Sequence, residues 1–172
     1  EIPRRHAFGQ MTNGVDVQRF QTAALEVTTV LQRVVYTSSP DRGLHHLLRI
    51  WPRVRDVVPE ATLHVYYDID KWAETTLEGE AQGIVMPTAD RAKYIKMVKA
   101  DPPAGVTFMG GVNQGTLARA QVEAQVLAYP CDPVSPTEGF SMTVLEGITA
   151  GCKVLTTTAD AFPELWANVP NV

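Results

Sequence analysis

Short apolar segments rich in β-branched residues alternate along this chain with longer segments of helical period. The apolar segments lack regular polar alternation, which is typical of strands covered on both faces of a sheet. Five of them are clear, and we expect a sheet of about six strands. The clear segments are 33–37, 61–67, 106–109, 125–129 and 152–157.

Between the strands, apolar side chains recur at spacings of three and four, as on one face of a helix. The clearest stripe starts at Leu44, and Pro52 predicts a kink or a helix end within it. The segment 68–87 is acidic and is expected to be a surface loop or a short helix. The predicted helices are 44–58, 90–99, 116–124 and 141–150, the last stopped by Gly151.

Strands that alternate with helices predict βαβ units and a parallel sheet with right-handed crossovers. We therefore predict an α/β protein with a Rossmann-like, doubly wound parallel sheet. The 172 residues are expected to form a single domain, with 1–30 as a lead-in and 31–172 as the core. Ligands of such sheets bind beyond the carboxyl ends of the strands.

The composition excludes several classes of protein. With 45% hydrophobic and 20% charged residues, the chain is not disordered as a whole. A net charge of −4 disfavours nucleic acid and anionic membranes as partners, although a local basic site for a small anion remains possible. There is no apolar run of the roughly 18–20 residues that a transmembrane segment needs.

Two further features concern location. Cys131 and Cys152 have neither metal-like spacing nor a disulfide-dense pattern, which favours a reducing, cytoplasmic setting. The charged residues Glu1 to Arg5 are unlike a signal peptide and lack an initiator Met. We therefore expect a fragment of a longer protein.

The stretch PTEGFSMTVLEGITAG, residues 136–151, is the most informative part of the sequence. It follows a strand and leads into a helix, with Gly139 allowing close backbone approach. A helix start attracts phosphate through its dipole and its unpaired amides. Those amides would belong to four consecutive residues, Phe140, Ser141, Met142 and Thr143.

Two glutamates flank this helix start. Glu146 lies roughly 7–8 Å along the helix axis from Ser141, about the span from a diphosphate to a ribose. Its carboxylate could accept hydrogen bonds from two hydroxyls, and Glu138 could do the same for a sugar. On spacing alone, a solvated cap residue and a helix-surface glutamate explain the pair about equally well.

Glu138 and Glu146, within EGFSMTVLEGITAGCKVL, resemble the E-x7-E signature of GT-B glycosyltransferases, particularly glycosyltransferase family 4. Other segments resemble that family in the same order, so the resemblance covers nearly the whole chain. The E-x7-E stretch is fairly specific, and each other segment is weak alone. These segments are Asn13–Asp16 with Phe20, Arg42–Leu44, Val106–Gly110 and Pro163–Glu164.

The resemblance implies the nucleotide-sugar-binding, C-terminal half of a two-domain retaining enzyme that needs no metal. Glu138 would hold the donor sugar as the catalytic residue, and Glu146 would hold the ribose. The backbone of Phe140 to Met142 would bind the diphosphate. Gly111 and Val112 would meet the base through their main chain.

Further expectations follow from the same resemblance. The donor would be a UDP- or GDP-linked sugar, bound as substrate, with no cofactor. The partner would be an acceptor domain of the same full-length protein, to which residues 1–30 lead. The isolated domain is expected to bind donor weakly and to transfer nothing.

One departure from the family concerns its cations. Family members usually carry an Arg about five residues before the Lys of a Lys-Gly turn, and here those positions are Thr37 and Arg42. One cation is therefore missing, unless Ser38, Ser39 or a residue of the acceptor domain substitutes. Arg42 can hold two phosphate oxygens at once, although without the family context it reads as a solvated residue beside Asp41.

Three alternatives remain. Asp68 and Asp70 follow a strand as D-x-D, the way metal-dependent GT-A transferases hold a cation. The loop Gly110–Gly115 lies between a strand and a helix but lacks the dinucleotide-binding spacing. The chain could also be a non-catalytic module that binds a nucleotide or sugar.

The neighbouring His45 and His46 point about 100° apart on a helix. We therefore expect one of them to be packed and the other exposed, and we expect no metal shared between them.

Overall fold

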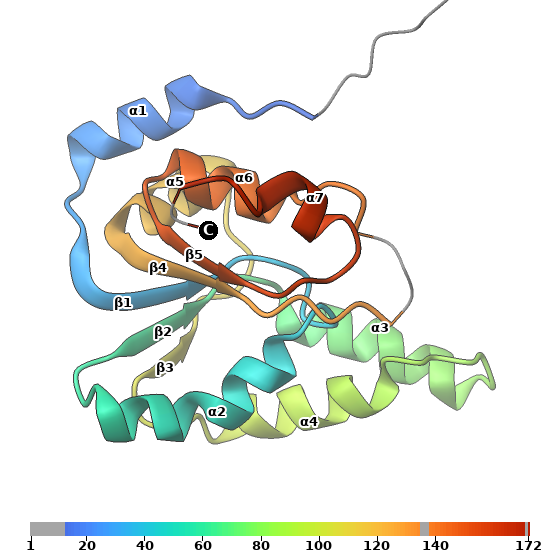
Figure 1. Cartoon of the computed structure of the whole chain (residues 1–172). Coiled ribbons are helices and arrows are strands. Elements are labelled where there is room, and N and C mark those ends of the chain that lie inside the picture. The colour runs from blue at the N-terminus through green and yellow to red at the C-terminus, as the bar shows by residue number, and fades with distance from the viewer. Residues whose placement is uncertain (1–12, 135–137, 171) are drawn as a thin grey trace, which may run out of the picture.

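The computed structural model describes residues 13–134, 138–170 and 172, and it is built on a five-stranded, fully parallel sheet (Figure 1). The strand order is β3-β2-β1-β4-β5. The predicted α/β class, the parallel sheet and all five clear strands are confirmed, while a sixth strand does not occur among the described residues. The strands are β1 Val30–Tyr36, β2 Thr62–Val65, β3 Val106–Phe108, β4 Ala124–Tyr129 and β5 Lys153–Thr156.

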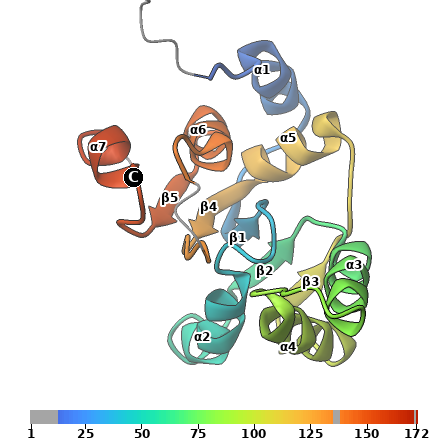
Figure 2. The ribbon, with the colours of Figure 1, turned by 90° about the vertical axis from the view of Figure 1, so that its right-hand side faces the viewer.

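Helices cover both faces of the sheet, as a doubly wound fold requires. α2 and α4 lie on one face, and α5 and α6 lie on the other, with α1 packed outside α5 (Figure 2). None of the described helices has both the length and the hydropathy needed to cross a bilayer. The helices are α1 Val17–Glu26, α2 Leu44–Val57, α3 Ile69–Ala81, α4 Ala89–Ala100, α5 Gln114–Glu123, α6 Met142–Thr149 and α7 Phe162–Trp166.

The structure decides two points about the helices that the sequence left open. The acidic segment after β2 contains the 13-residue helix α3, which begins where the Asp68 side chain accepts the amide of Lys71 and which buries Ile69 and Ala73. Pro52 does not end α2, which continues to Val57. The buried side chains of α2 all precede the proline and end at Trp51, and beyond it the partly buried Val54 still packs against the core.

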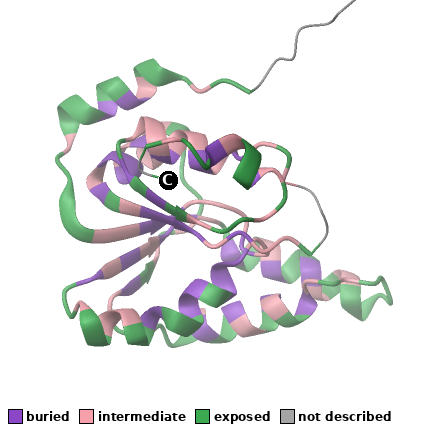
Figure 3. Cartoon of the chain, in the orientation of Figure 1, coloured by how far each residue is buried: buried purple, intermediate pink, exposed green. Residues whose placement is uncertain are grey.

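The core lies between the sheet and the inner faces of the helices (Figure 3). Tyr36, Leu63 and Leu127 in the central strands are fully buried. Trp51 is also buried, and its indole nitrogen donates to the carbonyl of Ala104 at 3.1 Å. Each such side chain contributes roughly 1.5–3 kcal/mol through the hydrophobic effect, so the core holds the strand ends in fixed relative positions.

The strand order reverses between β1 and β4. The chain runs outward from β1 to β3 on one side and then crosses to β4 and β5 on the other. The loops after β1 and β4 touch at this point, because a Cβ on Gly43 would lie 1.8 Å from the Pro130 carbonyl oxygen. Ligands of open parallel sheets bind at such a reversal, so this is where the site residues are sought.

Candidate functional site

The start of α6 presents free backbone amides at the carboxyl edge of the sheet. Ser141 is buried and caps the helix, its hydroxyl accepting the Val144 amide at 3.3 Å. The first-turn amides of a helix have no intrahelical acceptor, which leaves those of Met142 and Thr143 for a ligand. A Cβ on Gly139 would meet nothing within 4 Å, so the space beside this backbone is open.

Glu138 precedes this helix start and is held by three residues. One carboxylate oxygen accepts the Tyr129 hydroxyl at 2.8 Å and the Arg42 guanidinium at 2.5 Å. The amide of Glu138 donates to the Asp160 carboxylate at 3.0 Å. Burial raises the pKa of Tyr129, so the phenol stays protonated and acts as a donor. The Glu138 side chain is only 11% exposed and therefore has a defined direction.

The loop after β1 brings Arg42 to this carboxylate. Ser39 shapes the loop, because its carbonyl accepts the Tyr36 hydroxyl at 2.7 Å and the Arg42 amide at 3.0 Å. The Ser39 hydroxyl donates to the Asp41 carboxylate. Arg42 was expected to bind the phosphates and Glu138 the sugar. In the structure the two side chains form an ion pair with each other.

Glu146 has a partner that the sequence did not indicate. Arg19 of α1 donates to its carboxylate at 2.8 Å, and the two side chains are 21% and 16% exposed. Asp16 caps α1 and accepts the amide of Arg19. The segment Asn13–Asp16 with Phe20 resembles the family and lies next to Arg19, so the sequence pointed to this region. No spacing in the sequence, however, indicates that Arg19 would pair with Glu146, which lies 127 positions away.

A cavity of about 590 Å³ opens beyond the ends of β1, β2 and β3. Gly111 and Val112 line it, at the place expected for a base, and so does Thr37. Trp72 adds an aromatic wall, and Lys71 supplies the positive charge among the lining residues. The other lining residues are Tyr66, Tyr67, Asp68, Thr75, Thr76, Gln114 and Leu117.

The geometry gives no support to the two alternative motifs. Asp68 caps α3, whereas Asp70 forms an ion pair with Lys99, so the two carboxylates have separate partners. In the Gly110–Gly115 loop, Asn113 caps α5 by accepting the amide of Thr116 at 2.9 Å. That loop follows an edge strand rather than a strand at the reversal point.

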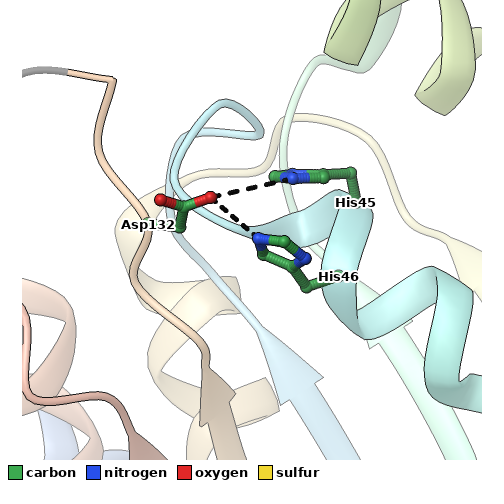
Figure 4. Close-up of side chains that lie close together, drawn as sticks. All are labelled: His45, His46 and Asp132. Carbon is green, nitrogen blue, oxygen red and sulfur yellow. Dashed lines mark hydrogen bonds and ion pairs between the residues drawn. The ribbon is translucent and has the colours of Figure 1, made fainter.

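His45 and His46 were expected to point too far apart to share a metal, but their ring nitrogens approach the same carboxylate oxygen. Both face Asp132, which follows β4 (Figure 4). His46 Nε2 lies 2.8 Å and His45 Nε2 lies 3.9 Å from the same Asp132 oxygen. The two imidazole side chains can both reach this oxygen because Asp132 belongs to the loop after β4 and not to α2. As expected, His45 is buried and His46 is exposed.

A cation already occupies the Asp132 carboxylate. Arg91 donates to the same oxygen at 3.0 Å, so a metal ion there would have to displace a guanidinium. Burial lowers the pKa of His45 to about 4, helped by the charges of His46, Arg91 and Arg49. His45 is therefore neutral near pH 7, and Arg91 supplies the charge that holds Asp132.

Residues 31–170 match the family model of the group 1 glycosyl transferases. The chain belongs to this family. A comparison with curated protein sequences gives no match.

Solved glycosyltransferase structures share the fold of this group 1 glycosyl transferase at low sequence identity. Anabaena HepE, solved with UDP and glucose, has a TM-score of 0.59 at 16% identity, over 89% of this chain and 39% of HepE. AviGT4, involved in avilamycin A biosynthesis, has a TM-score of 0.60 at 15% identity, over 90% of this chain and 40% of AviGT4. The chain thus spans about two fifths of those proteins.

A shorter structure matches more of its own length. The C-terminal domain of the group 1 family protein LpcC from Francisella tularensis has a TM-score of 0.53 at 18% identity, over 88% of this chain and 74% of that one. In this group 1 glycosyl transferase, the E-x7-E glutamates lie on either side of an amide-rich helix start, each paired with an arginine. The arrangement offers donors for an anion and carboxylates for hydroxyl groups.

Proposed function

We propose that this group 1 glycosyl transferase domain binds a nucleotide-sugar and presents its sugar for transfer. The observation that carries the proposal is the start of α6, with free amides between two ion-paired glutamates at the reversal of strand order. Such a helix start suits a diphosphate. Glu138 precedes this helix start and Glu146 lies within the helix, so we propose that Glu138 accepts from the sugar hydroxyls and Glu146 from the ribose.

The cavity beside β1, β2 and β3 supplies a place for the base. Gly111 and Val112 expose main-chain groups there, and Trp72 offers an aromatic surface. The HepE structure was solved with UDP and glucose, which makes a UDP-sugar the first donor to test. GDP-linked sugars are the second.

Bond breakage at the sugar leaves negative charge on the diphosphate. The amides of Met142 and Thr143 and the guanidinium of Arg42 are the groups of this chain that can stabilise that charge. For Arg42 to do so, the diphosphate must compete with Glu138, which is then released toward the sugar. We propose family 4 membership, a retaining transfer and no requirement for a metal, as the resemblance implies.

The acceptor would bind elsewhere in the full-length protein. This chain spans about two fifths of HepE and AviGT4, so we propose that it is the C-terminal, donor half of a two-domain enzyme with a cleft between the halves. The isolated domain should then bind nucleotide weakly and transfer no sugar. Two free, buried cysteines fit a reducing compartment, and we propose a cytoplasmic location.

The test is a titration of this domain with UDP, GDP and ADP at millimolar concentration, followed by amide NMR shifts, with and without Mn²⁺. We expect one nucleotide to saturate without metal and to shift Gly111, Val112, Met142 and Thr143. Binding that requires Mn²⁺ and shifts Asp68 and Asp70 would overturn the proposal. Transfer by the full-length protein, lost on Glu138→Gln, would separate an enzyme from a non-catalytic module.

A further inference from the structure

Arg91 links the two loops that meet at the reversal of strand order. It lies in the first turn of α4, and the sequence analysis did not single it out. One guanidinium nitrogen donates to the carbonyl of Asp41 at 2.5 Å and to the carbonyl of Asp132 at 2.6 Å. The other donates to the Asp132 carboxylate at 3.0 Å. Asp41 belongs to the loop after β1, and Asp132 belongs to the loop after β4.

Arg91 suits this linking role chemically. Its planar guanidinium presents several donors in a fixed fork, which lets one side chain satisfy two carbonyls and a carboxylate together. The side chain is 20% exposed, so the bonds are only partly open to water. His46 Nε2 donates to the same Asp132 oxygen at 2.8 Å. Asp132 is thus held from both α2 and α4.

The linked loops carry the residues proposed for the donor. Arg42 directly follows Asp41, and its amide is bonded to the Ser39 carbonyl. Cys131 directly precedes Asp132, and its amide is bonded to the Tyr129 carbonyl at 2.7 Å. The Tyr129 hydroxyl in turn holds Glu138. Asp41 is thus adjacent to Arg42, and Asp132 is connected to Glu138 through Cys131 and Tyr129.

We infer that Arg91 is a positioning residue for the donor diphosphate. It fixes the loop after β1 against the loop after β4, so that Arg42 faces the start of α6 before any ligand binds. Its own charge is committed to Asp132, so it acts through Arg42 rather than on the phosphate. The inference rests on the proposed function and adds a residue to it. Positioning of this kind lowers the cost of ordering the site on binding.

The test compares Arg91→Gln with Arg49→Gln. Arg49 lies on α2 with its guanidinium 4.8 Å from the Tyr94 ring centroid of α4, so it shares the α2–α4 contact. No hydrogen bond from Arg49 to either loop occurs among the described residues. We expect Arg91→Gln to weaken UDP binding about ten-fold, equal to about 1.4 kcal/mol. Uridine binding, which involves no phosphate, should change less than two-fold, and Arg49→Gln should change neither.

Hydrogen exchange in the ligand-free protein gives an independent readout. The amides of Arg42 and Cys131 should exchange faster in Arg91→Gln than in the wild type, and Arg49→Gln should leave them unchanged. Unchanged exchange and an unchanged ratio of UDP to uridine affinity would overturn the inference. Failure of the wild type to bind any nucleotide would instead overturn the proposed function, while the exchange rates still test the link.

If Arg91→Gln does not fold, Arg91→Lys provides a second test of the inference. A lysine keeps the charge but not the planar fork, so we expect intermediate exchange rates and an intermediate loss of UDP affinity. If Arg91→Lys matched the wild type in both measurements, charge alone would suffice and the positioning role would be wrong.

Discussion

Arg42 and Glu138 are 96 residues apart in the sequence and form an ion pair with an N–O distance of 2.5 Å. In the ligand-free protein the predicted phosphate-binding cation is thus neutralised by the predicted sugar-binding carboxylate. A diphosphate that reaches Arg42 has to compete with this carboxylate. Binding of a diphosphate to Arg42 would therefore release the Glu138 carboxylate, which is then free to bind the sugar.

Glu138→Gln should tighten UDP binding several-fold, by about 1 kcal/mol, because a neutral amide no longer competes for Arg42. Calorimetry on the isolated domain measures this. Glu164→Gln, which removes an exposed carboxylate from α7, is the control for net charge. A weaker affinity for UDP in Glu138→Gln would mean that Glu138 contributes directly to nucleotide binding.

Glu146→Gln should weaken nucleotide binding by about 1–3 kcal/mol, the range for a hydrogen bond to a charged group. The substitution replaces a charged acceptor with two oxygens by a neutral amide with one, and it leaves Arg19 without its carboxylate. Glu123→Gln is the matched control, since Glu123 pairs with Arg33 at 2.7 Å and does not line the cavity. Equal affinities in wild type and Glu146→Gln would remove Glu146 from the site.

Gly43→Ala should destabilise the fold by more than about 2 kcal/mol, because a Cβ would lie 1.8 Å from the Pro130 carbonyl oxygen at a φ of +102°. Gly83→Ala is the comparison, with a φ of +79° and nothing within 4 Å of the added atom. It should cost only about 1–2 kcal/mol, the strain of the left-handed conformation. Urea unfolding measures both, and equal losses would show that the two loops do not touch as described.

Stability should fall as the pH is lowered from 7 toward 4, in part through His45. Its pKa is about 4 in the folded protein and 6.5 ordinarily, so between these values the unfolded chain binds a proton that the folded protein does not. The free energy of unfolding should lose about 2 kcal/mol at most between pH 7 and pH 5 from this residue.

His45→Gln is the variant that isolates this effect, measured by urea unfolding at both pH values. The loss on acidification should be smaller than in the wild type. It should not vanish, because burial also lowers the pKa of His64. A loss equal to that of the wild type would show that His45 is already protonated in the folded protein.

The sequence predicted the strands well because each contains a short run of mainly apolar residues that lies between segments of helical period. It left α3 open between a loop and a short helix, since the buried side of that helix has one large apolar residue, Ile69, beside the small Ala73 and the polar Thr76. The Thr76 hydroxyl is satisfied by the Trp72 carbonyl at 2.9 Å, which only the folded helix reveals. α2 continues through Pro52 to Val57, because packing of the helix on the core outweighs the lost hydrogen bond.

The two glutamates of the candidate site were predicted from a local motif, in which they are eight residues apart. Their partners could not be found in that way. Arg19 lies 127 residues from Glu146, and Arg91 lies 41 residues from Asp132. Such pairs depend on which helix packs beside which strand, and a single sequence contains no spacing that encodes it.

By itself the sequence determined the alternation of strands and helices, the parallel sheet and the amide-rich helix start between two glutamates. These depend on side-chain periodicity and on residues close together in the chain. Only the tertiary structure decided that Arg42 pairs with Glu138, that Arg19 pairs with Glu146 and that Arg91 links two loops. The physical reason is that burial brings distant charges together where water no longer competes strongly for them, so their pairing follows from the packing of the fold.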